Sequence, residues 1–140
     1  MIKIFKSKKI MSEIVNQKSA CPIHSITELL NRKWVFGILR DMFLGKKHFN
    51  EFKTSQPNMS NVVLSDTLKY LEKQGLIIKN VCYEESQKKT EYYLTEKGEK
   101  INAVLYEMVL YGLYVLEDDL RTEEYKKQIK EEYEEILNIN

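Results

Sequence analysis

The residues best suited to contact a ligand lie in a short stretch that begins at Ser60. Leu64, Leu68 and Leu71 follow one another at i, i+4 and i+7, so they predict one apolar face of a helix. At about 100° per residue the other faces carry small polar, apolar and charged side chains. These are the candidate contact residues Ser60, Asn61, Val62, Ser65, Asp66 and Lys69. Such side chains suit phosphates and base edges, and valine suits a thymine methyl group. The alternative is an ordinary solvated helix face.

The segments around this helix predict a helix-turn-helix followed by a β-hairpin. In order, we expect a helix over about 23–31, a helix with apolar residues from Trp34 to Phe43, a two-turn helix at Phe49–Phe52, and the helix that Ser60 caps and Gly75 ends. The stretches Leu76–Tyr83 and Thr90–Leu94 are β-prone, and the polar run 84–89 predicts the loop between them. Two strands alone are marginally stable, so the hairpin must pack on the helices as a wing. The predicted fold class is mainly α (α+β), a winged helix-turn-helix.

Two further helices are expected near the C-terminus, one over about 96–119 and one capped by Thr122. Their apolar residues predict a surface for pairing with a second copy of the chain. The residues chosen for this dimerisation surface are Leu113, Leu116, Tyr125, Ile129, Tyr133 and Ile136. Two-fold pairing would double the contacts of a small domain and match a palindromic site. The last helix could instead fold back on its own core, and both alternatives stay open at this stage.

The pattern of short motifs resembles the HxlR-type family of winged-helix regulators, relatives of the MarR group. The resemblance covers Cys21 to about Gly112. It rests on Cys21-Pro22-Ile23, Lys33-Trp34, Ile38-Leu39-Arg40, Phe49-Asn50-Glu51-Phe52, Met59-Ser60, Val63-Leu64, Leu68–Leu71, Leu76-Ile77 and Tyr92–Gly98. It implies a homodimer that binds double-stranded DNA and regulates transcription, with repression as the common case. A winged-helix module that binds proteins and not DNA is the alternative function.

The chain departs from this family in the charge of the predicted contact helix. Relatives usually carry a basic residue where Val62 stands, and Asp66 adds an acid to the same side. Other cations are therefore expected to contribute phosphate contacts. The chosen lysines are Lys53 and, at the expected wing tip, Lys88 and Lys89, with Lys46 and Lys47 as further candidates. Simple solubility of a loop is the alternative interpretation of the wing lysines.

Cys21 is the candidate redox sensor. It precedes Pro22 at an expected helix start, where the helix dipole favours a reactive thiolate, and some relatives respond to oxidants or electrophiles through a cysteine at this place. A partly buried structural residue is the alternative. Cys82, within a strand, is expected to pack. Cys21 and His24 alone supply too few ligands for a metal, so no metal and no cofactor is predicted.

Charge and composition fit this interpretation and exclude others. The 140 residues carry a net charge of +1, but residues 1–100 hold 18 lysines and arginines against 11 acids, whereas residues 101–140 hold 4 against 10. No phosphate-binding loop, nucleophile motif or paired carboxylates are evident, so an enzyme is not expected. No signal peptide or membrane span is evident, which predicts a cytoplasmic protein with no membrane partner. We expect a flexible arm over 1–20, a winged helix-turn-helix domain over 21–120 and a dimerisation helix over 121–140. A small-molecule or oxidant effector is possible on this interpretation and is not identified.

Overall fold

The computed structural model describes Ser12, residues 21–116 and residues 121–139 of the chain. These divide into two units, residues 1–33 and 34–140. In the first unit, helix α2 spans Pro22–Leu30 and begins at Cys21, with the proline in its first turn, where no backbone N–H is needed. The arm predicted over 1–20 lies outside the described residues apart from Ser12.

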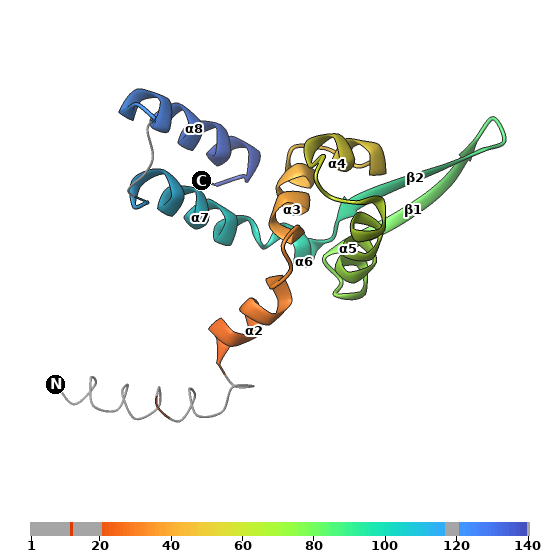
Figure 1. Cartoon of the computed structure of the whole chain (residues 1–140), viewed down its shortest axis with the longest axis horizontal. Helices are drawn as coiled ribbons and strands as arrows, with labels where there is room; N and C mark the ends of the chain where they lie inside the picture. The colour runs from red at the N-terminus through yellow and green to blue at the C-terminus, as the bar shows by residue number, and fades with distance from the viewer. Residues whose placement is uncertain (1–11, 13–20, 117–120, 140) are drawn as a thin grey trace. The chain divides into compact units, whose positions relative to one another are not determined.

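Three helices of the second unit form the helix-turn-helix body (Figure 1). Helix α3 spans Val35–Phe43, α4 spans Phe49–Ser55 and α5 spans Asn61–Lys73. The core between them is built from fully buried apolar side chains such as Ile38, Leu39 and Phe52. Gly45, with a φ of 88°, follows α3 in the left-handed conformation that glycine adopts at little cost. The predicted order of helices is confirmed.

The wing is an antiparallel pair of β1 (Ile77–Glu84) and β2 (Gln87–Leu94). Ile77 lies opposite Leu94, and the ladder continues to Glu84 opposite Gln87. The turn therefore contains only Glu85 and Ser86, whose φ values are 50° and 67°. The loop predicted over 84–89 is wrong, because this two-residue left-handed turn matches the twist of the strands and lets the polar residues after it pair.

The wing joins the helices through a close backbone contact at Gly98. This glycine lies in α6 (Glu96–Glu99), which Thr95 caps by accepting a hydrogen bond of 3.1 Å from the Gly98 N–H. A Cβ atom placed on Gly98 would lie 2.0 Å from the carbonyl oxygen of Leu76, at the start of the wing. Two side chains tie the same segments together, since Thr95 donates to the Gly75 carbonyl and Lys97 to the Gln74 carbonyl. Only glycine fits this position.

The long helix predicted over 96–119 is divided. After α6, the Ile101 N–H donates to the Gly98 carbonyl three residues back, at 3.2 Å, and this tighter turn separates α6 from α7 (Asn102–Tyr114). Residues 117–120 lie outside the described residues. Helix α8 (Glu123–Ile136) then packs on α7 within the same unit, as Figure 1 shows. The fold class, a mainly helical winged helix-turn-helix, is as predicted.

Candidate nucleic-acid interface

The inner face of α5 is fixed by three leucines. Leu64, Leu68 and Leu71 are each at most 1% exposed, which confirms the inward direction predicted from their spacing. Thr67 is also buried, and its hydroxyl donates to the Val63 carbonyl at 2.7 Å. Helix α5 contacts both α4 and β1 through this side. Its orientation is therefore set by core packing.

The outer face of α5 is open in the described chain. Val62 is 70% exposed, and Asn61, Asp66 and Lys69 are exposed as well, while Ser65 is half-buried. The Ser60 side-chain oxygen accepts a hydrogen bond of 3.1 Å from the Val63 N–H, as expected of an N-cap. Its hydroxyl hydrogen stays available to donate. We call these six residues, Ser60, Asn61, Val62, Ser65, Asp66 and Lys69, the outer face of α5.

This helix carries no net charge on its exposed part. Asp66 and Glu72 are exposed, and so are Lys69 and Lys73. A helix with balanced charges gains little from general attraction to phosphates, so contacts at particular positions must supply most of its affinity for a nucleic acid.

Lys53 has a structural partner close by. Its ammonium group donates to the carbonyl oxygen of Met59 in the turn between α4 and α5. Met59 itself is 1% exposed, so it anchors that turn in the core, a role that was not predicted from the sequence. Lys53 therefore stabilises the helix-turn-helix from within the chain, whether or not it also contacts an external phosphate.

The two wing lysines differ in their surroundings. Both lie on β2, so their predicted place at the tip of the wing is wrong, because the turn is shorter than expected. Lys89 lies 3.6 Å from a carboxylate oxygen of Glu84 and 3.9 Å from one of Glu91. Lys88 is exposed opposite Tyr83, which is 72% exposed. Of the two lysines predicted at the wing tip, Lys88 is thus the one that is open to an external partner.

The root of the wing holds a small electrostatic network. Tyr93 donates a hydrogen bond to Glu91, which lowers the pKa of that carboxyl, and the nearby Lys47 and Lys89 lower it further. The same hydrogen bond raises the pKa of Tyr93. The Lys47 ammonium lies 3.9 Å from Glu91 and 5.8 Å from the centre of the Tyr93 ring. Lys47 and Lys89 are therefore partly neutralised within the chain.

Among the described residues, Lys69, Lys73, Lys79 and Lys88 are exposed lysines with neither an ion pair nor a hydrogen bond, whereas Lys97, also without an ion pair, donates to the Gln74 carbonyl. Lys73 and Lys79 are not among the contact residues predicted from the sequence. The helical spacing does indicate Lys73, because at 100° per residue it points away from the leucine face of α5. Lys46, a further candidate, donates to the Ser55 hydroxyl at 3.2 Å and is less available.

The two cysteines lie in different units. Cys21 is half-buried at the N-cap of α2, and its side chain makes no capping hydrogen bond. His24, in the same helix, pairs with Glu28 at 3.1 Å. Cys82 is half-buried in β1, with its sulfur 3.6 Å from the Lys89 carbonyl oxygen. Within the described ranges no three His, Cys, Asp or Glu residues form a metal-binding group.

The apolar stripe of α8 is directed largely at α7 of its own chain. The Tyr106 hydroxyl donates to Glu134 at 2.8 Å, and the Asn102 side chain donates to the Leu137 carbonyl at 2.9 Å. Of the residues selected for dimerisation, Ile129, Tyr133 and Ile136 are half-buried by this packing. Leu113 is 2% exposed and has no surface to offer a partner.

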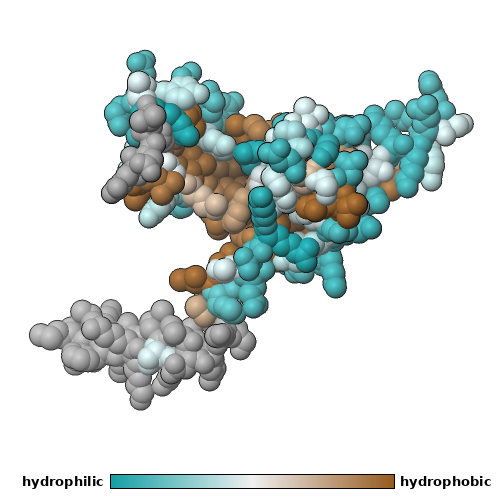
Figure 2. Space-filling model, viewed as in Figure 1, coloured by the Kyte–Doolittle hydropathy of each residue, from teal (hydrophilic) through white to brown (hydrophobic). Residues whose placement is uncertain are grey.

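A different apolar surface stays exposed on α7. Val104, Met108, Tyr111 and Val115 follow at i, i+4, i+7 and i+11, and each is at least 39% exposed. We call these four residues the outer stripe of α7. Leu116 and Tyr125, from the predicted dimerisation set, are 58% and 53% exposed. Figure 2 shows apolar surface gathered over the region of the C-terminal helices.

Comparisons with known proteins place this geometry among transcription regulators. A family model described as HxlR-like helix-turn-helix matches residues 29–130. The HTH-type transcriptional regulator YvaP of Bacillus subtilis (strain 168) is 34% identical over 95 residues, which cover 67% of this chain and 87% of YvaP. The HTH-type transcriptional regulator YodB of the same organism is 36% identical over 89 residues, 63% of this chain and 79% of YodB.

Two solved structures have similar folds. The redox regulator HypR in its reduced form aligns with a TM-score of 0.62 and 27% identity, covering 81% of this chain and all of HypR. The reduced form of YodB from B. subtilis aligns with a TM-score of 0.59 and 30% identity, covering 71% of this chain and 97% of YodB. None of the described helices has the length and apolar character required to cross a bilayer.

Proposed function

We propose that this chain, which belongs to the HxlR-like helix-turn-helix family of DNA-binding transcriptional regulators, reads the major groove with the outer face of α5. One observation carries the proposal. The leucines of α5 are fully buried, while Val62 on the opposite side is 70% exposed with the polar residues around it. A recognition helix needs this combination of a fixed position and a free surface.

The outer face of α5 supplies two kinds of contact. Ser60, Asn61 and Ser65 have groups that hydrogen-bond to phosphates or base edges, and Val62 suits the methyl group of thymine. Lys69 neutralises a phosphate, and Lys88 does so from the wing. Because the exposed charges of α5 balance, base-edge and apolar contacts contribute more to its affinity for DNA than phosphate contacts do.

The active species is a homodimer that pairs through α7. The outer stripe of α7 exposes four apolar residues in the single chain, and Leu116 and Tyr125 add to that surface. Covering such a surface removes apolar area from water, which favours association. The acidic residues of α8 repel DNA at this end of the chain. Two-fold pairing then presents two α5 helices to a palindromic operator, where the dimer acts as a repressor.

Cys21 makes the regulator responsive to oxidants. Its thiol lies half-buried at the start of α2, and the thiolate is the form of a cysteine that acts as a nucleophile. With hydrogen peroxide, the sulfur attacks one oxygen, the O–O bond breaks, and sulfenic acid and hydroxide form. The relatives HypR, a redox regulator, and YodB, with a solved diamide-treated form, support this role.

Selection of bound duplexes from a random pool tests the proposed function most directly. A homodimeric reader enriches a palindromic sequence, and the affinity for that sequence falls as the salt concentration rises. The control is a scrambled duplex of the same composition. A winged-helix module for protein binding would enrich no sequence and show little duplex affinity at any salt concentration, and that result would refute the proposal.

A further inference from the structure

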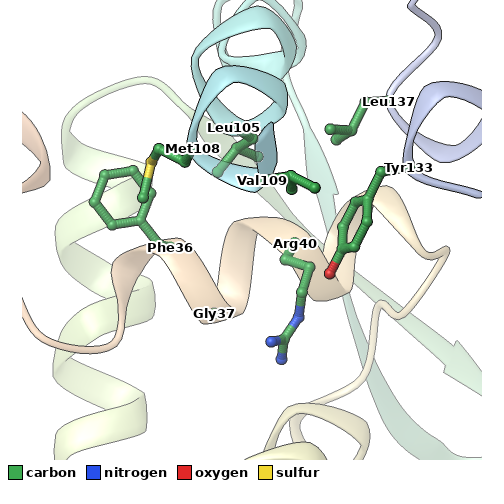
Figure 3. Close-up of a pocket in the computed structure, with 8 residues that line it drawn as sticks. All are labelled: Phe36, Gly37, Arg40, Leu105, Met108, Val109, Tyr133 and Leu137. Carbon is green, nitrogen blue, oxygen red and sulfur yellow. The ribbon is translucent and has the colours of Figure 1, made fainter. Parts of the chain in front are cut away.

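A pocket of about 220 Å³ opens between the helix-turn-helix body and the C-terminal helices. Figure 3 shows the side chains around it. Its lining residues are Phe36, Gly37 and Arg40 of α3, Leu105, Met108 and Val109 of α7, and Tyr133 and Leu137 from α8 and its C-terminal end. Most of this lining is apolar, and the polar atoms of its side chains belong to Arg40 and Tyr133.

The charges beside the pocket do not balance. Arg40 donates to one carboxylate oxygen of Asp41 through Nε at 3.3 Å and Nη2 at 3.1 Å. The Lys46 ammonium lies 3.7 Å from that same oxygen. Asp41 is completely buried, so two cations share one carboxylate, and one positive charge is left in excess. A partly enclosed excess charge favours an anion more than the same charge in water does.

Two hydrogen-bond donors at the pocket are also unused. Both bonds from Arg40 to Asp41 leave Nη1 without a partner among the described residues. No hydrogen bond of the Tyr133 hydroxyl occurs within the described ranges either. Figure 3 shows the guanidinium group and the hydroxyl on the same side of the pocket, with the apolar side chains above them. The arrangement offers donors at one end and an apolar surface at the other.

We propose that this pocket binds a small organic monoanion with a flat apolar body, such as an aromatic carboxylate. The carboxylate accepts from Arg40 and Tyr133, and the ring packs against Phe36, Leu105 and Val109. Pockets for drug-sized ligands measure about 300–1,000 Å³, so this smaller pocket suits a single ring with short substituents. Nothing in this step requires the chain to bind DNA.

The position of the pocket gives the ligand a route to regulation, a step that does rest on the proposed function. Helix α3 contacts α4 and β2, which belong to the helix-turn-helix and the wing. Helix α7 carries the outer stripe proposed for dimerisation. A ligand held between α3 and α7 therefore biases the distance between the two α5 helices of a dimer, and with it the affinity for an operator.

Benzoate and its neutral counterpart benzyl alcohol test the site in the full chain without DNA. The readout is the methyl resonance of Met108, assigned among the five methionines in ¹³C-methyl-labelled protein. We expect benzoate to shift this resonance saturably and to bind about ten-fold more tightly than benzyl alcohol, because it makes a charge-assisted hydrogen bond. Equal affinities, or no shift up to tens of millimolar, would overturn the proposal.

Three variants locate the binding. Val109→Trp fills the pocket and should abolish the benzoate shift, whereas Ala103→Trp, on an exposed part of the same helix, should leave it unchanged. Arg40→Gln should weaken benzoate about ten-fold and change benzyl alcohol less than two-fold. If benzoate still binds to Val109→Trp, the assignment to this pocket is overturned. It is also overturned if the benzoate affinity depends on protein concentration, as expected of a site shared with a second copy.

The regulatory step is read separately on the selected duplex. Saturating benzoate should change the duplex affinity of the wild-type chain and leave that of Val109→Trp unchanged. An unchanged wild-type affinity, with the Met108 shift present, would refute the coupling alone. A chain that binds benzoate and no duplex would refute the proposed function alone.

Discussion

Replacement of Lys69 by alanine gives the sharpest test of the outer face of α5. Lys69 is exposed and has no ion pair within the described residues, so its ammonium is free to neutralise one phosphate in each half of a dimeric complex. Each such contact contributes about 0.9 to the slope of the logarithm of the binding constant against the logarithm of salt concentration. Two lost contacts should make this slope shallower by about 1.8.

The same reasoning sets the loss of affinity. At 0.1 M salt, counterion release makes each phosphate contact worth about eight-fold, so the dimer should bind about 60-fold more weakly. Fluorescence anisotropy of a labelled duplex at five salt concentrations measures both quantities. The loss should be similar for the selected duplex and for a scrambled one, because a phosphate contact carries no sequence information.

The matched control for Lys69 is another exposed lysine far along the chain. Lys127 of α8 is 75% exposed, and its ammonium lies 4.0 Å from a carboxylate oxygen of Glu131. Its replacement by alanine removes one positive charge, as Lys69→Ala does. The salt dependence of duplex binding by Lys127→Ala should have the same slope as that of the wild-type chain. If Lys69→Ala and Lys127→Ala give the same slope, the outer face of α5 does not meet the DNA backbone and the reasoning fails.

Three further predictions concern assembly, sensing and the wing. Tyr111→Glu puts a charge in the outer stripe of α7 and should convert the dimer into monomers in sedimentation velocity. Cys21→Ser should remove the effect of hydrogen peroxide on duplex binding, while Cys82→Ser keeps it. Replacing Glu85 by Asn and Ser86 by Gly suits the left-handed turn and should raise the free energy of unfolding by about 1 kcal/mol in urea titrations.

Each of these has a result that contradicts it. Glu107→Ala, at an exposed position of α7 outside the stripe, is the control for assembly, and a dimer that tolerates Tyr111→Glu excludes this interface. A peroxide response that persists in Cys21→Ser rules out that thiol as the sensor. An unchanged or lower midpoint in the turn variant means that Glu85 and Ser86 are not strained.

Local signals were sufficient to predict most of the helix-turn-helix. The leucine spacing of α5, the cap at Ser60 and the glycines at 45 and 75 act within a few residues, so their effects can be worked out without the rest of the chain. The hairpin turn gave no such signal, because Glu85-Ser86 lacks the Asn-Gly pattern typical of a left-handed turn. The turn is short because Glu84 pairs with Gln87, and the polar composition of residues 84–89 does not indicate that these residues pair as strands.

The candidate site was predicted less completely, since it depends on contacts between distant segments. Nothing in the sequence near Lys53 or Lys89 indicates that one binds a turn carbonyl and the other two carboxylates. An apolar stripe such as that of α8 looks the same whether it packs on its own chain or on a partner. The structure directs it largely at α7 and leaves the outer stripe of α7 uncovered.

The contact between Gly98 and the Leu76 carbonyl has a consequence for how this protein can evolve. The wing is oriented where it leaves the helices by two stretches of backbone in direct contact, with the Leu94 side chain at the end of β2 packed beside them. Substitutions along the exposed faces of the strands can therefore alter which groups the wing presents while its direction stays the same. Specificity for new targets can be acquired there one residue at a time, provided that position 98 keeps its hydrogen atom in place of a side chain.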